Sequence, residues 1–330
     1  MKKSFFAVAG GLVLVILAVI IFQPKAPLDG EIFAMDTVVS FKIFGDKAML
    51  DQSKRLTERL DKDFSFYGNG DVAKINLSGC EEASQETAEI ITDFTELYQK
   101  YGNAVDVTAG EITSLWGVST ENPKIPTDEE ISKALKTVGG ENISLDGEKV
   151  TLKNGAKLDF GAVAKGFLCD KLKEIYDAEK VKCAIVSTGS STLLYGEKPD
   201  KSPFTVEIKN PNGGAPLGVV KTKETFISTS GGYERFFEAD GKKFHHIFDL
   251  ATGYPANTEI TSVTVFCDSG ISSDFLSTKI FIDGVEKIPE NLSSTEFMAV
   301  IATQNEVYYS AGLDFSPNAE SGFLVGEIDG

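Results

Sequence analysis

Apolar residues recur at intervals of three and four in five segments of the chain, which predicts amphipathic helices. In residues 46–64, for example, the leucines and phenylalanines fall on one helical face. Ser84 is placed to cap a helix that ends at Gly102, and Thr127 with Glu130 has the spacing of a capping box. The predicted helices cover residues 46–64, 84–102, 127–135, 163–175 and 272–282.

Runs rich in β-branched and aromatic residues predict strands, and several of the turns between them have hairpin sequences. Asp146-Gly147 and Asn154-Gly155 predict a small meander from Ile143 to Phe160. Ala239-Asp240-Gly241 predicts a hairpin across residues 233–248. The other predicted strands are residues 31–44, 183–187, 204–209, 226–229, 260–267 and 297–303.

Hairpins mixed with separated helices are typical of an α+β domain rather than of a doubly wound parallel sheet. No Gly-x-Gly-x-x-Gly follows the first predicted strand, so a Rossmann dinucleotide site is not expected. After residue 25 the chain has no internal repeat, and the only linker-like stretch is residues 23–30. We therefore expect one large mixed domain of antiparallel sheet and packed helices over residues 26–330.

The N-terminus contains an apolar run of 18 residues, 5–22, without a charged side chain. As a helix rising ~1.5 Å per residue it nearly crosses a hydrocarbon layer ~30 Å thick. Lys2 and Lys3 precede it and should stay in the cytoplasm. Residues 1–25 are thus predicted to be a membrane anchor that displays the domain outside the cytoplasmic membrane. The alternative is a cleaved signal peptide. The sequence argues against it, because Gln23-Pro24-Lys25-Ala26-Pro27 contains no small-x-small cleavage site.

The chain has 330 residues and a formal net charge of −17. Residues 1–25 contribute three lysines and no acid, so the rest of the chain carries −20. A body of that charge repels phosphate backbones and anionic lipid surfaces, and no cluster of Lys and Arg offsets it. Non-specific nucleic-acid binding is therefore excluded as a function class.

The four cysteines, Cys80, Cys169, Cys183 and Cys267, are scattered along the chain. No Cys-x-x-Cys occurs and no histidine lies at metal-ligand spacing, so a zinc site is not expected. Export would permit disulfides, which the sequence alone does not pair. The prediction that we favour is four buried free thiols.

Asp274 and Thr278 are four residues apart in the predicted helix 272–282, which places a carboxylate and a hydroxyl on one face. One carboxylate with neutral oxygens suits Mg²⁺, which keeps waters or phosphates as its other ligands. A solvated polar helix face has the same pattern.

Four further segments carry candidate chemistry. Thr229-Ser230-Gly231-Gly232-Tyr233, with Arg235 close behind, exposes successive backbone N–H groups that suit a phosphate, although a plain glycine-rich turn has the same sequence. His245 and His246 are the only histidines, and neighbours on a strand point to opposite faces. One of them must face inward or into a cleft, either as a structural group or as a proton acceptor with Asp249 nearby.

The segment 158–166 runs from a strand into a helix and carries Asp159 and Lys165 among glycines and alanines. A helix start binds anions through its free N–H groups, and a lysine adds a mobile charge. Asp106 is a carboxylate between apolar neighbours in Ala104-Val105-Asp106-Val107-Thr108. For each of these groups, local capping of a turn is the alternative to ligand binding.

Taken together and in this order, the segments resemble the ApbE family of flavin transferases, over nearly all of residues 31–330. The resemblance rests on the following segments: Met35-Asp36-Thr37, Asp63-Phe64-Ser65-Phe66-Tyr67, Val105-Asp106-Val107-Thr108, Leu115-Trp116-Gly117, Leu158 to Gly166, Thr229 to Arg235, His246-Ile247-Phe248-Asp249, Thr252-Gly253-Tyr254-Pro255, and Asp274 with Thr278.

The resemblance implies an enzyme that binds FAD and Mg²⁺ and joins FMN to a Thr or Ser hydroxyl of a target protein, releasing AMP. By position, the residues implied to line the FAD site are Met35, Tyr67, Asp106, Asp159 and Lys165. The backbone carbonyl of Ala162, with Asp274 and Thr278, is implied to hold Mg²⁺, and His246 to deprotonate the acceptor hydroxyl. The implied partners are extracytoplasmic flavoproteins with a Ser/Thr-Gly-Ala-Ser/Thr site.

Three positions depart from the family pattern. Asp36 stands where a glycine is usual, Gly189-Ser190 replaces a Gly-Gly pair, and Asp249-Leu250-Ala251-Thr252-Gly253 lacks an arginine. None removes an implied metal ligand or the histidine, so we expect activity, with FAD affinity open to change.

Two other functions fit the same residues. A Mg²⁺-dependent FAD pyrophosphatase would use water in place of the acceptor hydroxyl, and a flavin-binding surface protein would hold FAD without reaction. Covalent FMN on this chain itself is disfavoured, because the acceptor pattern does not occur in it.

Overall fold

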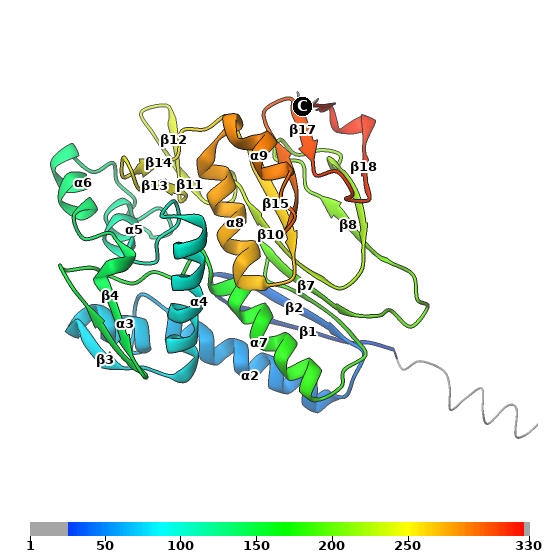
Figure 1. The fold of residues 1–330 in the computed structure, drawn as a ribbon, viewed down its shortest axis with the longest axis horizontal. Helices are drawn as coiled ribbons and strands as arrows, with labels where there is room; N and C mark the ends of the chain where they lie inside the picture. Colours follow the sequence, from blue (N-terminus) through cyan, green and yellow to red (C-terminus); the bar gives the residue numbers. More distant parts are fainter. Residues whose placement is uncertain (1–25, 327–330) are drawn as a thin grey trace, which may run out of the picture.

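A nine-stranded sheet runs through the computed structural model, which describes residues 26–326 (Figure 1). Neighbouring strands are antiparallel except for the last pair, β17 and β19. In spatial order the strands are β1 (Leu28–Ala34), β2 (Thr37–Ile43), β6 (Cys183–Ser187), β7 (Ser191–Gly196), β10 (Thr225–Ser230), β15 (Ser262–Cys267), β16 (Met298–Ala302), β17 (Glu306–Tyr309) and β19 (Leu324–Val325).

Helices cover one face of this sheet. Strand β6 shows how the alternation of side chains divides the two faces: Ala184 and Val186 pack toward the helices, whereas Cys183 and Ile185 pack on the other side. The helices are α2 (Lys47–Phe64), α4 (Gln85–Tyr101), α7 (Ala164–Ala178) and α8 (Gly270–Asp283). Each predicted helix of this group is confirmed.

A three-stranded sheet covers the other face, with an apolar core between the two sheets that includes Ile227 and Phe266. Its strands are β8 (Phe204–Ile208), β9 (Gly218–Thr222) and β18 (Phe315–Pro317). The α+β prediction of a mixed antiparallel domain is thus confirmed.

The end of the molecule opposite this small sheet is a lobe of short elements, on the left in Figure 1. Its helices are α3 (Asp71–Ser78), α5 (Gly110–Trp116) and α6 (Asp128–Leu135). Its strands are β3 (Cys80–Glu82), β4 (Ile143–Asp146), β5 (Lys149–Leu152), β11 (Phe236–Ala239), β12 (Lys242–His245), β13 (Phe248–Asp249) and β14 (Tyr254–Pro255). Outside this lobe lies α9 (Ile288–Leu292), and 3₁₀ turns occupy Gly140–Asn142, Val285–Lys287 and Ala319–Ser321.

Side-chain caps begin the helices where the sequence predicts them. Ser84 accepts from the amide of Thr87 at the start of α4. At α6 the hydroxyl of Thr127 accepts from the Glu130 amide while the Glu130 carboxylate accepts from the Thr127 amide, which completes the predicted capping box. These caps satisfy N–H groups that have no partner within their helix.

Two predictions made from the sequence are wrong. Asn154 and Gly155 do adopt left-handed turn conformations, but no hairpin strand follows them. The chain instead continues to Lys157, which forms a parallel bridge with Ala109, and β5 pairs with β3 on its free side. Cys80 is exposed on β3, so only three of the four free thiols are buried.

No helix within residues 26–326 is long and apolar enough to cross a membrane. The anchor predicted at residues 5–22 lies outside this range.

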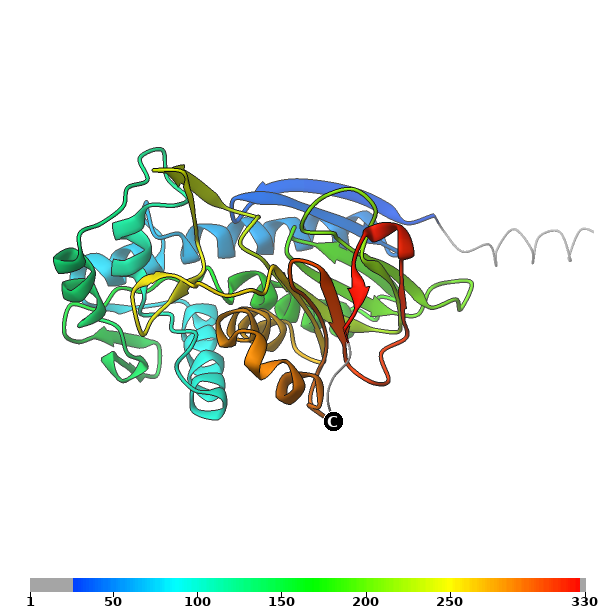
Figure 2. The same cartoon turned by 90° about the horizontal axis from the view of Figure 1, so that it is seen from above.

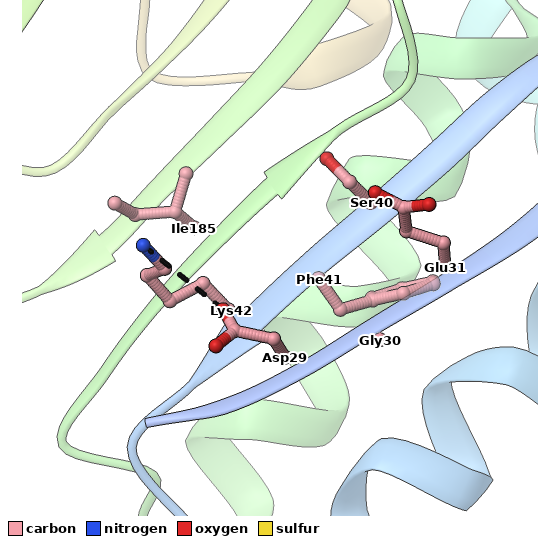
Figure 3. A pocket seen from close by; sticks show the side chains of 7 residues that line it. All are labelled: Asp29, Gly30, Glu31, Ser40, Phe41, Lys42 and Ile185. Carbon is pink, nitrogen blue, oxygen red and sulfur yellow. Dashed lines mark ion pairs between the residues drawn. The ribbon is translucent and has the colours of Figure 1, made fainter. Parts of the chain in front are cut away.

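The β1–β2 hairpin and α2 lie one above the other in Figure 2. On the hairpin a hollow of about 240 Å³ is lined by Asp29, Glu31 and Lys42, with Ile185 of β6 at its side (Figure 3). Lys42 and Asp29 form a loose ion pair at 4.0 Å across it. None of the predicted site residues lines this hollow.

Candidate active site

Helices α7 and α8 touch at their first turns, and this contact positions the candidate site. A Cβ atom added to Gly166 would lie 2.0 Å from the carbonyl oxygen of Gly270, and one added to Gly270 would lie 2.1 Å from that of Gly166. Only glycine at both positions permits this approach. As a result, the start of α7, which carries Lys165, lies directly beside the face of α8 that carries Asp274.

Asp274 is a buried carboxylate whose two oxygens accept from different parts of the fold. Oδ2 accepts from the Gly166 amide at 2.6 Å, and Oδ1 accepts from the Ser191 hydroxyl at 2.5 Å. Burial raises the pKa of Asp274, and the charge of Lys165 opposes that rise. Asp274 forms no ion pair with any residue of 26–326, so its negative charge calls for a cation.

The carbonyl of Ala162 lies just before α7, whose N-cap is Val163. The amide four residues further on, that of Gly166, donates to Asp274 and not to this carbonyl. Here no backbone or side-chain donor within the described part of the chain reaches that carbonyl. The Ala162 oxygen is therefore left available to a ligand beside Asp274.

Hydroxyl groups on β10 face α8 and extend the oxygen-rich surroundings of Asp274. Ser230 Oγ lies 3.0 Å from Thr278 Oγ1 and 2.9 Å from Ser277 Oγ. Ser228 Oγ lies 2.7 Å from Ser273 Oγ, one turn earlier on α8. The sequence analysis missed the roles of Ser191 and Ser228, although the alternation Ser228-Thr229-Ser230 on a strand is the signal for hydroxyls on one face.

The donor set around Asp274 is made of hard oxygen atoms only. Across residues 26–326 no group of three or more His, Cys, Asp and Glu side chains is placed to hold a metal ion. A zinc-type or multi-carboxylate site is thus absent from that range. One carboxylate, a backbone carbonyl and a hydroxyl are a set that fits Mg²⁺, because Mg²⁺ retains water or phosphate as its remaining ligands.

Two cationic side chains border this region. Lys165 forms no ion pair within the described residues, and burial lowers its pKa while Asp274 raises it. Arg235 lies near enough for its charge to lower the pKa of Lys165 further. Its guanidinium pairs with Asp36 at 3.5 Å. Two cations near one another, close to the buried Asp274, favour an anionic ligand between them.

Asp36 sits at the tip of the β1–β2 hairpin, in the position where the family pattern has glycine. Met35 and Asp36 adopt positive φ angles of 52° and 57°, which glycine adopts at lower cost than other residues. The Met35 amide donates to Asp61 Oδ1 at 2.7 Å. The backbone conformation expected of glycine is therefore retained by Asp36, which adds a carboxylate against Arg235.

The two histidines have different surroundings. His245 is used on both ring nitrogens: Nε2 lies 3.1 Å from the Ala256 carbonyl, and Nδ1 accepts from the Ile247 amide at 3.2 Å. Its ring packs edge-on against Phe281 at 5.6 Å, and burial lowers its pKa. His245 is thus a structural residue held by the backbone on both sides.

His246 keeps one nitrogen without a protein partner. Its Nδ1 lies 3.2 Å from the Arg235 carbonyl, which can only accept a hydrogen bond and so requires the ring hydrogen to be on Nδ1. Nε2 then carries a lone pair and has no hydrogen-bond partner within residues 26–326. Burial lowers the pKa of His246 to about 4, with the positive charge of Arg235 contributing. The ring is therefore neutral near pH 7 and able to accept a proton at Nε2.

Asp106 and Asp159 lie in neighbouring loops joined by a hydrogen bond from the Asp159 amide to the Val107 carbonyl at 2.7 Å. Asp106 Oδ1 accepts from the amide and hydroxyl of Thr108 at 2.8 and 2.7 Å. Burial raises the pKa of Asp106, which these bonds partly oppose. Asp159 accepts from Thr113 Oγ1 at 2.6 Å and from the Gly161 amide at 2.8 Å. Both carboxylates cap their own turns, as the alternative reading of the sequence expected.

Tyr67 is 63% exposed just beyond the end of α2, with its ring edge-on to that of Phe66 at 5.1 Å. Phe64, three residues before it, packs against Phe160 with ring centroids 5.2 Å apart. The tyrosine is thus held near the loop that carries Asp159, although no contact joins it to another predicted site residue within residues 26–326.

Trp116 connects two segments that the sequence analysis singled out separately. Its indole N–H donates to the Gly253 carbonyl at 2.9 Å, across 137 positions of sequence. The ring is fully buried and packs against Phe244 and Phe248, at 5.5 and 6.0 Å between centroids. These contacts fix the end of α5 against the segment from β12 to β14, which carries the histidines.

Comparisons with known proteins agree with these observations. A profile of the ApbE family matches residues 35–301. The FAD:protein FMN transferase of Klebsiella pneumoniae is 31% identical over 232 residues, which cover 68% of this chain and 71% of that protein. That of Treponema pallidum is 31% identical over 207 residues, 57% of either protein, so this match spans less than two thirds of the relative.

Solved structures share the fold. The ApbE protein of Thermotoga maritima is 28% identical with a TM-score of 0.76, covering 89% of this chain and 97% of that one. Flavin transferase ApbE from Vibrio cholerae is 23% identical with a TM-score of 0.75, covering 91% and 99%. At 23% identity, the likeness to the Vibrio cholerae protein is evidence for the fold alone.

Proposed function

This chain belongs to the ApbE family, an enzyme family whose relatives are named FAD:protein FMN transferases, and we propose that it transfers FMN from FAD to a Ser or Thr hydroxyl of a target protein, releasing AMP. The observation that carries the proposal is the arrangement around Asp274. This buried carboxylate accepts a hydrogen bond from the Gly166 amide, and it lies one helical turn from Thr278. The Ala162 carbonyl receives no hydrogen bond from the described residues.

Those three groups, Ala162, Asp274 and Thr278, are the ones that we propose hold Mg²⁺. Bound there, Mg²⁺ would draw charge off the non-bridging oxygens of the FAD diphosphate. The buried, unpaired carboxylate and the orphaned carbonyl both fit this ion. A chain whose body carries −20 also needs a cation to bring an anionic diphosphate near a carboxylate.

Lys165 and Arg235 are proposed to bind the diphosphate oxygens. Lys165 has no protein counter-ion within the described range, so its charge is available to the ligand. Arg235 has only an ion pair at 3.5 Å with Asp36, a long contact that a phosphate can replace. Met35, Tyr67, Asp106 and Asp159 are proposed to line the rest of the FAD site.

His246 is proposed to act as the base. As the acceptor oxygen bonds to the phosphorus of the FMN half, the bond from that phosphorus to the oxygen leaving with AMP breaks. The hydroxyl proton moves to Nε2 of His246, the nitrogen that has no protein partner. Phosphoryl transfer needs mainly positioning, charge stabilisation and such a base. The residues named here supply a group for each of these three needs.

The test is incubation of the purified chain with FAD, Mg²⁺ and a candidate acceptor that contains Ser-Gly-Ala-Thr. Flavin fluorescence that stays with the acceptor on a denaturing gel, together with a mass gain of one FMN, supports the transferase. Release of free FMN and AMP without labelling supports the pyrophosphatase instead. Intact bound FAD that is unaffected by His246→Ala would indicate a non-catalytic flavin-binding protein.

We further propose that residues 5–22 anchor the chain in the cell membrane, with the catalytic domain on the extracytoplasmic side. The support is the uncharged length of that segment and the lysines that precede it. Protease accessibility of the domain in intact spheroplasts, with the protein remaining in the membrane fraction after a high-salt wash, is the expected result. A domain that the protease cleaves only after the spheroplasts are lysed would contradict the proposed extracytoplasmic orientation.

A further inference from the structure

Asp170, on the second turn of α7, binds the start of a different helix. Its Oδ1 accepts from the amide of Gly270 and its Oδ2 from the amide of Ile271, both at 2.7 Å. These are the first two N–H groups of α8, which have no partner within their own helix. The next free amide, that of Ser272, donates to the hydroxyl of Ser269.

The contact is reciprocal between the two helices. Four residues before Asp170, the Gly166 amide of α7 donates to Asp274 of α8. Four residues before Asp274, the Gly270 amide of α8 donates to Asp170 of α7. Each helix thus gives an amide of its first turn to a carboxylate one turn further along the other. We term Gly166, Asp170, Gly270, Ile271 and Asp274 the α7–α8 clamp.

The clamp determines the relative position of the proposed Mg²⁺ ligands. Ala162 precedes α7, whereas Asp274 and Thr278 belong to α8, so the ligands lie on two separate elements. The glycines set how closely the two helices approach, and hydrogen bonds between the helices resist sliding along their axes. A carboxylate with one hydrogen bond on each oxygen opposes that sliding, because both bonds have to be kept at once.

An acid at this position is unfavourable unless it has such a role. Burial raises the pKa of Asp170 to about 7, its two amide bonds oppose the rise, and the charges of Asp93 and Asp274 add to it. Asp93 comes from α4 and Asp274 from α8, so negative groups face Asp170 from two sides. An apolar side chain would avoid this cost but would leave the two amides of α8 without acceptors.

We propose that Asp170 is a positioning residue of the Mg²⁺ site, which fixes the first turn of α8 against α7 and so holds Asp274 and Thr278 at the right place relative to the Ala162 carbonyl. This inference rests on the proposed function. It assigns Asp170 no contact with the metal or with FAD.

The test compares Asp170→Asn with Asp71→Asn in the full-length protein. Asparagine at 170 keeps one oxygen acceptor but presents an NH₂ group to the second amide. Asp71 is a matched control, because its Oδ2 accepts from the Ser84 amide at 2.7 Å and from Thr87 Oγ1 at 2.8 Å at the start of another helix. Calorimetric titration with Mg²⁺ alone measures the site without requiring turnover.

For Asp170→Asn we expect Mg²⁺ affinity to fall about tenfold, in the range typical of lost outer-shell support. The amides of Gly270 and Ile271 should exchange with deuterium faster, and the Mg²⁺ concentration for half-maximal FMN transfer should rise. Asp71→Asn should change Mg²⁺ affinity by less than about twofold. An unchanged affinity in folded Asp170→Asn, or an equal loss in both variants, overturns the inference.

If Asp170→Asn fails to fold, Asp170→Glu replaces it, since that variant keeps the carboxylate but moves it by one methylene. An intermediate loss of Mg²⁺ affinity is then expected, and wild-type affinity would overturn the inference. A wild-type protein that binds no Mg²⁺ also overturns it, while FMN labelling of an acceptor would still support the transferase. Conversely, Mg²⁺ binding without FMN transfer to an acceptor contradicts the function and leaves the comparison of variants valid.

Discussion

The backbone amide of Gly166, in the first turn of α7, donates to Asp274 Oδ2 of α8 at 2.6 Å. This bond joins residues 108 positions apart, and the Ala162 carbonyl just before α7 receives no donor from the described residues. This carboxylate and this carbonyl are two of the groups that we propose as metal ligands. The predictions below follow from this arrangement and from its neighbours.

Asp274→Asn should abolish Mg²⁺-dependent FMN transfer, lowering its rate by at least about 100-fold. The amide keeps the size of the side chain but removes the negative charge that a cation requires. Thr278→Val should have a smaller effect, because it removes one neutral ligand. Rates of acceptor labelling, followed by flavin fluorescence on a denaturing gel and measured against Mg²⁺ concentration, give the result. A rate in Asp274→Asn equal to the wild type shows that the metal assignment is wrong.

Gly166→Ala should destabilise the fold by about 1–3 kcal/mol, as overpacking of a close contact does. The added Cβ would lie 2.0 Å from the Gly270 carbonyl, so the helices have to separate. Gly45→Ala is the control, since its nearest contact would be 3.2 Å from a side-chain methyl. Urea unfolding of both variants measures the difference, and equal midpoints would contradict the close-contact argument.

Substitutions of the two histidines should have different effects on FMN transfer and on stability. His246→Gln removes the proposed base and should stop FMN transfer with little loss of stability. His245→Gln disturbs two backbone hydrogen bonds, and we expect a loss of about 1–3 kcal/mol in stability while transfer persists in the folded protein. Transfer rates and melting curves of both variants test this. Transfer retained by His246→Gln and lost by folded His245→Gln would reverse the assignment.

Acid should destabilise the protein partly through His246. Its pKa is about 4 in the fold and near 6.5 when unfolded, so the unfolded chain takes up a proton first as pH falls. The contribution is fully present above about pH 6.5 and is lost as pH drops toward 4, and it amounts to about 3 kcal/mol. Urea midpoints between pH 4 and 7 should depend less on pH in His246→Gln. Parallel curves for variant and wild type would contradict the lowered pKa.

Asp36→Gly should tighten FAD binding about threefold to tenfold, because it removes a negative charge and releases Arg235 from its ion pair. Stability should change little, since glycine relieves the positive φ but gains freedom in the unfolded chain. Asp36→Asn is the control that removes the charge alone. The KM for FAD should fall in both variants. A fall in Asp36→Gly alone would show that the backbone conformation, and not the charge, weakens FAD binding.

Local sequence information predicted many elements of this fold well. The caps at Ser84 and Thr127 form as expected, because a cap depends on residues three positions apart. The hairpin at Asn154-Gly155 failed because the turn itself forms but the chain after it bridges to Ala109 instead of folding back. Strand pairing of that kind depends on segments distant in sequence.

By itself, the sequence determined the family, the helix faces and the spacing that puts Asp274 and Thr278 one turn apart. Only the tertiary structure decided which oxygens surround Asp274, that the Ala162 carbonyl receives no donor from the described residues, and which histidine keeps a free nitrogen. The physical reason is that the surroundings of Asp274 are set where β10, α7 and α8 meet. Those of the histidines are set by contacts with Arg235, Ala256 and Phe281. A side chain's neighbours across such contacts come from segments tens of residues away, and no local pattern encodes them.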